Sequence, residues 1–261
     1  MPVKRKVGVI VESFRKQVRE GIHLASQLKL DGIQVYVTHG EMAPENLSKS
    51  GREEFLAFVR SQGLELSALC GDLGHGFVDP NKNQELIEKT KKMVDLCLDL
   101  STPILSTHIG VIPEGAQHPV WQVLTEALEE IGAYAENRDC VLATETGPES
   151  TELMARFLGS LKTSAIKVNY DPANLAMNEF DPVKGVRDLG QRIVHTHAKD
   201  GLGPKNGGPK EVPLGEGDVP FKDYLAALDS IGFDGFLTIE REVGDDPVAD
   251  ITKARDFLRS L

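Results

Sequence analysis

Short β-branched runs alternate with segments of helical periodicity along the whole chain, and this alternation limits the possible folds more than any other feature. Each run is mostly apolar, as a parallel strand covered on both faces requires. Each is followed by apolar residues three or four positions apart, which is typical of an amphipathic helix. Eight such units in 261 residues make about 33 residues per unit, the length of a strand–helix–strand repeat. The expected strands are Val7–Glu12, Gly32–Thr38, Leu64–Cys70, Pro103–His108, Cys140–Thr146, Ile166–Asp171, Ile193–Ala198 and Gly235–Glu240.

The expected fold class is therefore α/β, as either an open doubly wound sheet or a closed (β/α)8 barrel. A doubly wound sheet usually carries a glycine-rich phosphate turn, but neither GxGxxG nor GxxxxGK[ST] occurs here. The count of eight, and a length close to the roughly 250 residues of such barrels, favour the barrel. No linker divides the chain, so we expect a single domain, residues 1–261, folded as a TIM barrel. The long loop over 200–219 is expected to act as a lid.

The composition excludes several classes of protein. Lys and Arg total 29 against 40 Asp and Glu, and the net charge of −11 disfavours nucleic acid and anionic membranes as partners. No apolar run approaches the roughly 18 residues that span a bilayer, and the N-terminal apolar segment is too short for a secretory signal. Three widely spaced cysteines, Cys70, Cys97 and Cys140, are typical of reduced core residues. We therefore expect a cytoplasmic protein.

Polar side chains end four consecutive expected strands. These are Glu145, Asp171, His197 and Glu240, on the fifth to the eighth strand in that order. Chemistry in a (β/α)8 barrel lies at this end of the strands, and neighbouring strands are about 4.8 Å apart, so the four side chains can converge. Taken alone, each carboxylate is equally well explained as a helix cap or an ion-pair partner, and Asp171 before Pro172 as a turn former. The ordered set favours a shared site.

Three carboxylates and one imidazole would repel one another at a barrel mouth without a cation. We therefore predict that Glu145, Asp171, His197 and Glu240 bind one divalent metal ion. An oxygen-rich set with one nitrogen and no thiolate suits Mn²⁺ or Mg²⁺ best, with Mn²⁺ as our first choice, while Co²⁺ and Zn²⁺ also bind imidazole and carboxylate. His195 shares a strand face with His197 but lies farther from the strand end, so we assign it to the core.

Four further polar residues are candidates for substrate binding. His108 ends the fourth strand, and it either contacts a substrate oxygen or packs at the barrel mouth. Lys199 follows the histidine of the metal set by two positions, so it should project into the same mouth. Arg241 follows the last glutamate of the set; it either points away to pair with Glu242 or a helix, or reaches a substrate phosphate. Asn174 comes three residues after the aspartate.

In combination, these residues resemble a known family over nearly the whole chain. The chain is similar to the xylose isomerase-like TIM-barrel superfamily and, within it, to the sugar phosphate isomerase/epimerase group. The resemblance implies one Mn²⁺, Mg²⁺, Co²⁺ or Zn²⁺ ion on the four residues above and a sugar or sugar phosphate as substrate. It leaves a homo-oligomer open, since relatives are often dimers or tetramers. The matching pieces are THIG (Thr107–Gly110), TETG (Thr144–Gly147), YDPAN (Tyr170–Asn174), HTHAKD (His195–Asp200), PLGEGDVPF (Pro213–Phe221) and GFDGFLTIERE (Gly232–Glu242).

The same superfamily includes zinc-dependent endonucleases that cut DNA at abasic sites and bind three zinc ions. This chain departs from them, because position 174 is Asn where many relatives have histidine, and no DxH pair occurs in the loop 201–219. The charge of −11 also disfavours DNA. We therefore exclude the nuclease, and Asn174 likewise weakens a direct transfer from ketose 3-epimerases that carry histidine there.

The expected enzyme is a metal-dependent isomerase of carbohydrate metabolism, either a ketose epimerase or an aldose–ketose isomerase. An ion that chelates a sugar carbonyl and a neighbouring hydroxyl acidifies the α-proton, and Glu145 or Glu240 can remove it to give a stabilised enediolate. Two bases on opposite faces would epimerise the carbon, and one base moving the proton between adjacent carbons would isomerise the sugar. Two alternatives stay open: a dehydratase (lyase) acting on a keto-sugar or inosose, and a non-catalytic sugar-binding barrel with a structural metal.

Overall fold

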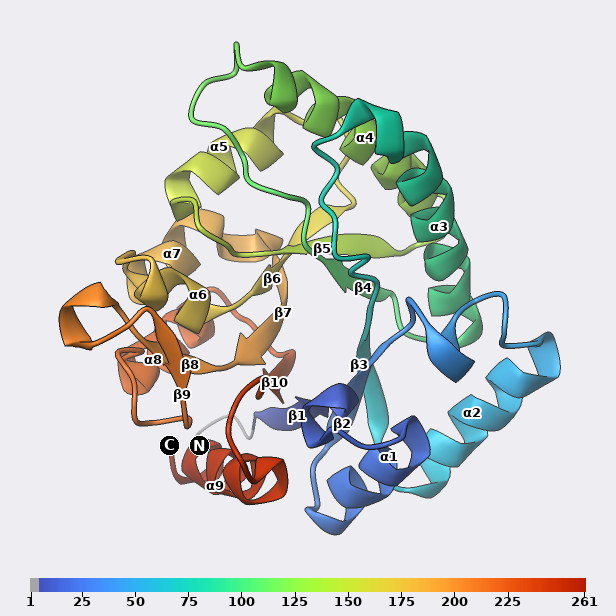
Figure 1. Cartoon of the computed structure of the whole chain (residues 1–261), viewed down its shortest axis with the longest axis vertical. Coiled ribbons are helices and arrows are strands. Elements are labelled where there is room, and N and C mark those ends of the chain that lie inside the picture. Colours follow the sequence, from blue (N-terminus) through green and yellow to red (C-terminus); the bar gives the residue numbers. More distant parts are fainter. Residues whose placement is uncertain (1–4) are drawn as a thin grey trace.

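The computed structural model describes residues 5–261, so residues 1–4 of the expected domain lie outside the described residues. Its centre is a closed barrel of eight parallel strands in the order β1-β10-β7-β6-β5-β4-β3-β2 (Figure 1). The expected single-domain (β/α)8 TIM barrel is thereby confirmed, with each predicted strand in place. The barrel strands are β1 (Lys6–Ile10), β2 (Gly32–Tyr36), β3 (Glu65–Cys70), β4 (Ile104–Thr107), β5 (Val141–Glu145), β6 (Ile166–Tyr170), β7 (Ile193–Ala198) and β10 (Phe236–Ile239).

Helices surround the barrel and cover its outer face (Figure 1). Their apolar faces and the outer faces of the strands form one continuous buried core. One short helix, α6, was not expected, because six residues are too few for a periodic pattern to show. The α-helices are α1 (Val18–Gln27), α2 (Lys49–Ser61), α3 (Pro80–Asp99), α4 (Pro119–Glu136), α5 (Thr151–Ser160), α6 (Pro172–Met177), α7 (Pro182–Leu189), α8 (Phe221–Ser230) and α9 (Pro247–Ser260).

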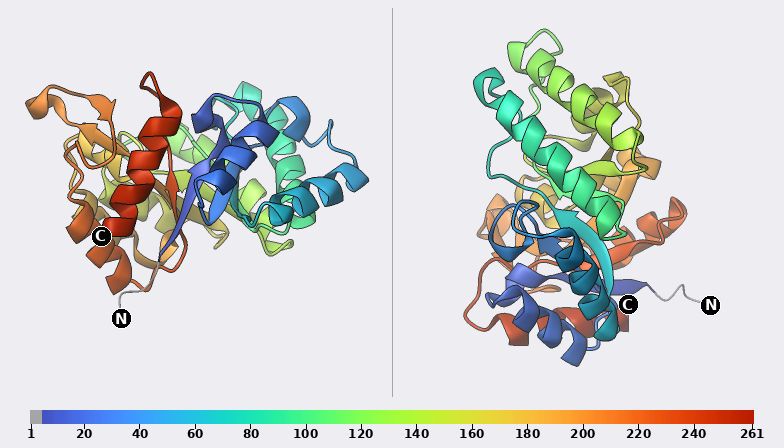
Figure 2. Two further views of the ribbon diagram at one scale, coloured as in Figure 1. Left: turned by 90° about the horizontal axis from the view of Figure 1, so that it is seen from below. Right: turned by 90° about the vertical axis from the view of Figure 1, so that its right-hand side faces the viewer.

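The long loop after β7 contains a small antiparallel hairpin, β8 (Asp200–Leu202) with β9 (Lys210–Val212). Figure 2 shows it extending outward at the barrel rim. The carboxylate of Asp200 closes the base of this loop by accepting four backbone N–H groups, from residues 201, 215, 217 and 219. A Cβ on Gly217 would lie 2.1 Å from Oδ1 of Asp200, so glycine is required there. The loop expected to act as a lid is therefore structured and anchored at its base.

Four helices begin with an Asp–Pro pair. The aspartates are Asp79 before α3, Asp171 before α6, Asp181 before α7 and Asp246 before α9, and each side chain accepts a backbone N–H of the first turn. Proline fits the next position because the first helical residues have no intrahelical partner for their N–H groups. The cap of α6 also matters for the site, because it fixes the orientation of the Asp171 carboxylate at the end of β6.

The interior of the barrel is polar around its axis. His195 is buried, with Nδ1 2.8 Å from Oδ1 of Asn169 and Nε2 2.9 Å from Oγ1 of Thr238. Burial lowers the pKa of His195 to about 3, and the neighbouring His197 acts in the same direction. His195 is thus a neutral, hydrogen-bonded core residue, and the assignment made from the sequence is confirmed.

Two further expectations concern the environment of the chain. Cys70, Cys97 and Cys140 are all free and buried, as expected of reduced core residues. Burial raises the pKa of the Cys70 and Cys97 thiols, which makes them poor nucleophiles. In the part of the chain that the structure describes, no helix combines the length and the apolar character needed to cross a membrane.

Candidate metal centre

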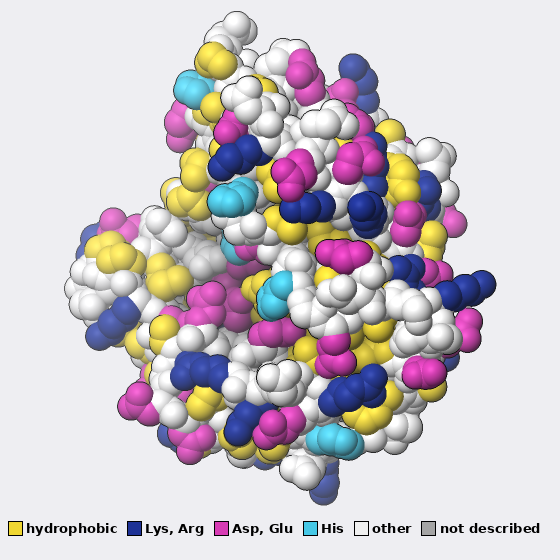
Figure 3. Space-filling model, turned by 45° about the vertical axis from the view of Figure 1, so that its right-hand side comes forward, with side chains coloured by type: hydrophobic (Ala, Val, Ile, Leu, Met, Phe, Trp, Pro, Cys, Tyr) yellow, Lys and Arg dark blue, Asp and Glu magenta, His cyan; other side chains and the backbone are white. Residues whose placement is uncertain are grey.

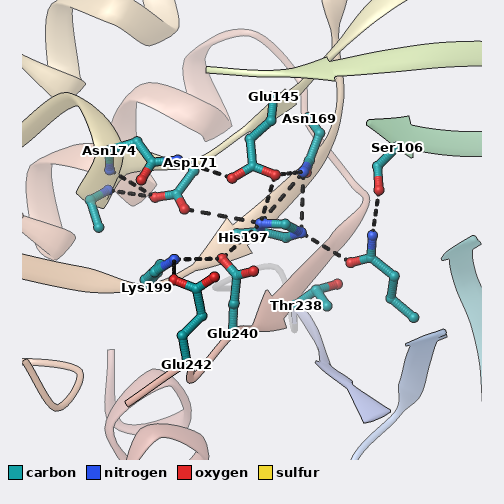
Figure 4. Close-up of polar contacts among 12 residues, drawn as sticks. Ser106, Glu145, Asn169, Asp171, Asn174, His197, Lys199, Thr238, Glu240 and Glu242 are labelled. Atoms are coloured by element: carbon teal, nitrogen blue, oxygen red, sulfur yellow. Dashed lines mark hydrogen bonds and ion pairs between the residues drawn. The ribbon is translucent and has the colours of Figure 1, made fainter. Parts of the chain in front are cut away.

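The four predicted ligand residues meet at the carboxyl end of the barrel (Figure 4). Each offers one nitrogen or oxygen atom, and these atoms all lie within 4.8 Å of one another. All four side chains are buried, and each comes from the end of a different strand. They are Glu145 at the end of β5, Asp171 directly after β6, His197 in β7 and Glu240 directly after β10. The convergence predicted from the order of strand ends is confirmed, and the cluster could hold a metal ion.

The imidazole of His197 turns one nitrogen toward the three carboxylates. Its Nδ1 lies 3.2 Å from Oε2 of Glu240, 3.4 Å from Oε2 of Glu145 and 4.0 Å from Oδ2 of Asp171. On the other side of the ring, Nε2 lies 3.0 Å from Oε1 of Gln34, an acceptor that calls for a proton on Nε2. In the neutral imidazole the lone pair then lies on Nδ1 and faces the carboxylates, which is the arrangement of a metal-binding histidine.

Asp171 uses its two oxygens differently. Oδ1 caps α6 by accepting the N–H groups of Ala173, at 2.7 Å, and Asn174, at 3.1 Å. Oδ2 is buried and has no hydrogen-bond partner among the described residues. A buried carboxylate oxygen without a partner is costly, and this one points into the cluster (Figure 4). The site therefore fits a divalent cation, because a cation would satisfy Oδ2 and offset three adjacent negative charges.

The charges of the cluster are balanced by protons and by one lysine. Burial raises the pKa of Asp171 to about 7, against the opposing effect of Lys199. Burial would lower the pKa of His197, but the carboxylates of Glu240 and Glu145 outweigh it and hold that pKa well above its usual value. Burial would raise the pKa of both glutamates, but cationic neighbours, His197 first, hold them below their usual values. A metal ion would replace the proton of the histidine.

Glu145 is positioned by neighbouring amides. Asn174 donates from Nδ2 to Oε1 of Glu145 at 3.0 Å, and Asn169 donates from Nδ2 to Oε2 at 3.2 Å. His108 approaches the same carboxylate, with Nε2 3.6 Å from Oε1, while its Nδ1 lies 2.8 Å from Oδ2 of Asp72. The hydrogen bond to Asp72, followed by the interaction with Glu145, raises the pKa of His108 to about 11. His108 is half exposed, so it is a cation that a ligand can reach.

Lys199 lies on the opposite side of the cluster. Its Nζ donates to Oε2 of Glu240 at 3.0 Å and to Oε2 of Glu242 at 2.7 Å. The lysine is buried, so this ion pair is shielded from solvent. As expected from the sequence, Lys199 enters the same mouth as His197, and its charge helps to keep Glu240 ionised.

Arg241 turns away from the cluster. Its guanidinium donates from Nη1 to Oε1 of Glu211 at 2.5 Å and from Nε to Oδ2 of Asp250 at 2.9 Å. Asp250 belongs to α9, so the expected pairing with a helix is present, whereas the expected pairing with Glu242 is not. The glutamate partner comes from β9, because the hairpin folds back over the end of β10.

A cavity of about 370 Å³ adjoins the cluster at Glu240 and extends toward the ends of β1 and β2. Glu12, from the short 3-10 helix that follows β1, lines it. Glu12 was the last residue of the first expected strand, so the strand-end signal that found Glu145 would also have found it. Gln34 and Asn169 were missed as well, although a polar residue inside an apolar strand is a usable signal.

Comparisons with known proteins agree with this geometry. The family model described as "Xylose isomerase-like TIM barrel" matches residues 22–261. The chain is 24% identical to an L-ribulose-5-phosphate 3-epimerase of Escherichia coli over 255 residues, which cover 92% of this chain and 88% of that protein.

Two solved structures are similar over most of the chain. A xylose isomerase domain protein of Planctomyces limnophilus superposes with a TM-score of 0.81 at 25% identity, covering 92% of this chain and 90% of that one. A probable 3-DHS dehydratase of Bacillus anthracis superposes with a TM-score of 0.79 at 18% identity, covering 97% and 98%. The family model covers far more than half of the chain, and the closed barrel with its four converging residues agrees with it. This chain belongs to the xylose isomerase-like TIM barrel family.

Proposed function

We propose that this protein is a divalent-metal-dependent sugar isomerase or epimerase. The observation that carries the proposal is the unpartnered, buried Oδ2 of Asp171 in a cluster that also holds two glutamates and the Nδ1 of His197. Glu145, Asp171, His197 and Glu240 would hold the ion, and the oxygen-rich set points to Mn²⁺. Similarity to an L-ribulose-5-phosphate 3-epimerase over 92% of this chain supports a carbohydrate as substrate.

When bound, the ion would supply Lewis-acid polarisation of a substrate carbonyl and lower the pKa of the adjacent C–H group. The residues of the chain then handle the proton. Glu240 is ionised, and its Oε2 is held by Lys199 while Oε1 has no hydrogen-bond partner among the described residues. Because Glu240 also lines the cavity, Oε1 is the oxygen that would remove the α-proton and leave an enediolate.

Glu145, in its protonated form, would act as the second acid–base group from the other side of the cluster. A proton delivered by Glu145 to the opposite face of the same carbon would give an epimer, with the removed proton left on Glu240, and return of the proton from Glu240 to the adjacent carbon would give the isomeric aldose or ketose. Asn174 orients Glu145, and the half-exposed His108 stands beside it to donate to a substrate oxygen. Two glutamates in one cluster exceed what a structural ion needs, which favours catalysis over sugar binding alone.

The direct test combines metal analysis of the purified protein with NMR-detected deuterium uptake from D₂O over a panel of ketoses and aldoses. We expect about one divalent ion per chain and exchange of one α-proton. Glu240→Gln and Glu145→Gln should each abolish exchange, while Glu53→Gln, an exposed glutamate on α2, serves as the matched control. Exchange that survives both active-site changes would contradict the acid–base assignment, and a product that has lost water would identify a dehydratase.

A further inference from the structure

The cavity beside the cluster is lined by both acidic and basic side chains. It lies at the ends of β1, β2 and β10, and its volume of about 370 Å³ suits a small ligand. Three glutamates line it, Glu12, Glu240 and Glu242. Figure 3 shows acidic side chains gathered in a hollow on this face of the molecule. A ligand bound at the metal cluster would extend into this acidic space, because Glu240 belongs to both.

The two arginines of the cavity wall are already engaged by the protein. Arg241 is buried between the carboxylates of Glu211 and Asp250. Arg15 donates from Nη1 to the carbonyl oxygen of Gly244 at 2.6 Å and from Nη2 to that of Glu242 at 3.0 Å. A phosphate group could recruit Arg241 only by leaving these two carboxylates without their cation, whereas Arg15 is exposed and keeps N–H groups that these two carbonyl oxygens do not use.

The two remaining basic side chains near the cavity, Lys199 and His39, also offer little to a phosphate group. Lys199 is shared between Glu240 and Glu242, so its charge is already matched. His39 also lines the cavity, and its Nδ1 lies 3.0 Å from the hydroxyl of Thr38. A phosphate ester with about two negative charges at neutral pH would thus face the imidazole of His39 and the exposed Arg15, among three carboxylates that repel it.

Glu12 gives the cavity a feature that suits a hydroxyl group. Its Oε1 accepts the backbone N–H of Tyr36 at 3.1 Å, whereas its Oε2 is buried and has no partner among the described residues. Burial raises the pKa of Glu12 to about 7, so a sugar hydroxyl that donates to Oε2 forms a charge-assisted hydrogen bond with the ionised form of this side chain. A phosphate oxygen carries no proton at neutral pH and can donate nothing.

We propose that the substrate is an unphosphorylated, uncharged polyhydroxy sugar, and that Glu12 accepts a hydrogen bond from one of its hydroxyl groups. This inference rests on the proposed function and narrows it to one class of substrate. The acidic wall then acts by exclusion, since a phosphate ester meets repulsion from three carboxylates and finds no buried guanidinium without a carboxylate partner. Glu12 sets specificity at a position away from the reacting carbon.

The test uses matched pairs, each a neutral ketose and its terminal phosphate ester, with the Mn²⁺-loaded protein. We expect α-proton exchange from at least one neutral sugar, with a kcat/KM at least about tenfold above that of its phosphate ester. Faster exchange from the phosphate esters would overturn the inference and leave the isomerase proposal standing. Exchange from neither member would instead refute the proposed function.

Calorimetric measurements of binding do not depend on turnover, so they distinguish failure of this inference from failure of the proposed function. Tighter binding of the neutral sugar than of its phosphate supports the inference even in a protein that catalyses no exchange, and the reverse order overturns it. Glu12→Gln should raise the Kd of the sugar at least about fivefold without changing the metal content. Unchanged sugar affinity in this variant, with the fold verified by circular dichroism, would refute the role of Glu12.

Discussion

The unpartnered oxygen of Asp171 makes a quantitative prediction about stability. In the metal-free protein, raising this pKa from its ordinary 3.8 to about 7 corresponds to about 4 kcal/mol of free energy at a pH above both values. The folded state favours the protonated carboxyl of Asp171. Its contribution to stability is therefore fully present below about pH 4 and is lost as the pH rises through 7 and the carboxyl ionises. Asp171→Asn keeps an acceptor for the cap of α6 but cannot ionise. In EDTA, the stability of this variant relative to the wild type should therefore grow by about 3 kcal/mol between pH 5 and pH 8.

Manganese should offset most of this difference between the two proteins. An ion at 100 times its Kd stabilises the wild type by about 2.7 kcal/mol, whereas the variant has lost a ligand and should gain much less at the same concentration. Urea unfolding followed by circular dichroism, in EDTA and in MnCl₂, measures both effects. Asp181→Asn is the matched control, because Asp181 caps α7 through the same Asp–Pro geometry on the exposed surface.

Two results would refute this reasoning. The first is a stability difference between Asp171→Asn and the wild type that does not grow with pH in EDTA. The second is equal stabilisation of both proteins by Mn²⁺. Either would mean that Oδ2 of Asp171 is not the group whose charge the cation offsets.

Three more predictions follow from the same contacts. Asn174→Ala removes the donor that holds Oε1 of Glu145, so the affinity for Mn²⁺ should fall about 10–100-fold in a calorimetric titration. Arg241→Met leaves the nearly buried carboxylates of Glu211 and Asp250 without their cation, which should cost about 3–5 kcal/mol in urea unfolding. Because the histidine and aspartate of the cluster hold protons near neutral pH in the metal-free state, Mn²⁺ should release protons at pH 7 and bind more tightly as the pH rises. Calorimetry in buffers of different ionisation enthalpy counts these protons.

The barrel and the four converging residues could be predicted because both depend on local pattern. An apolar run marks a buried strand, and a polar residue at its carboxyl end must face the mouth of a closed barrel. Glu145 and Asp171 therefore come together without any knowledge of their contacts. The rule depends only on the order of strands, which eight consecutive units already imply.

The supporting contacts could not be predicted, because they join distant parts of the chain. Gln34 meets His197 across 163 residues, and Arg241 meets Glu211 only because the β8–β9 hairpin folds back over β10. Such pairings depend on the tilt of the strands and on loop geometry, and neither produces a periodic pattern in the sequence. The helix after Asp171 was missed for a different reason, since it is a single capped segment of six residues.

The central claim is that one divalent ion lies among Glu145, Asp171, His197 and Glu240. Crystals grown with MnCl₂ and measured at the manganese absorption edge test it most directly. We expect one strong anomalous peak within bonding distance of all four side chains. No peak inside the cluster, or a peak bound by other groups with these side chains turned apart, would contradict the account.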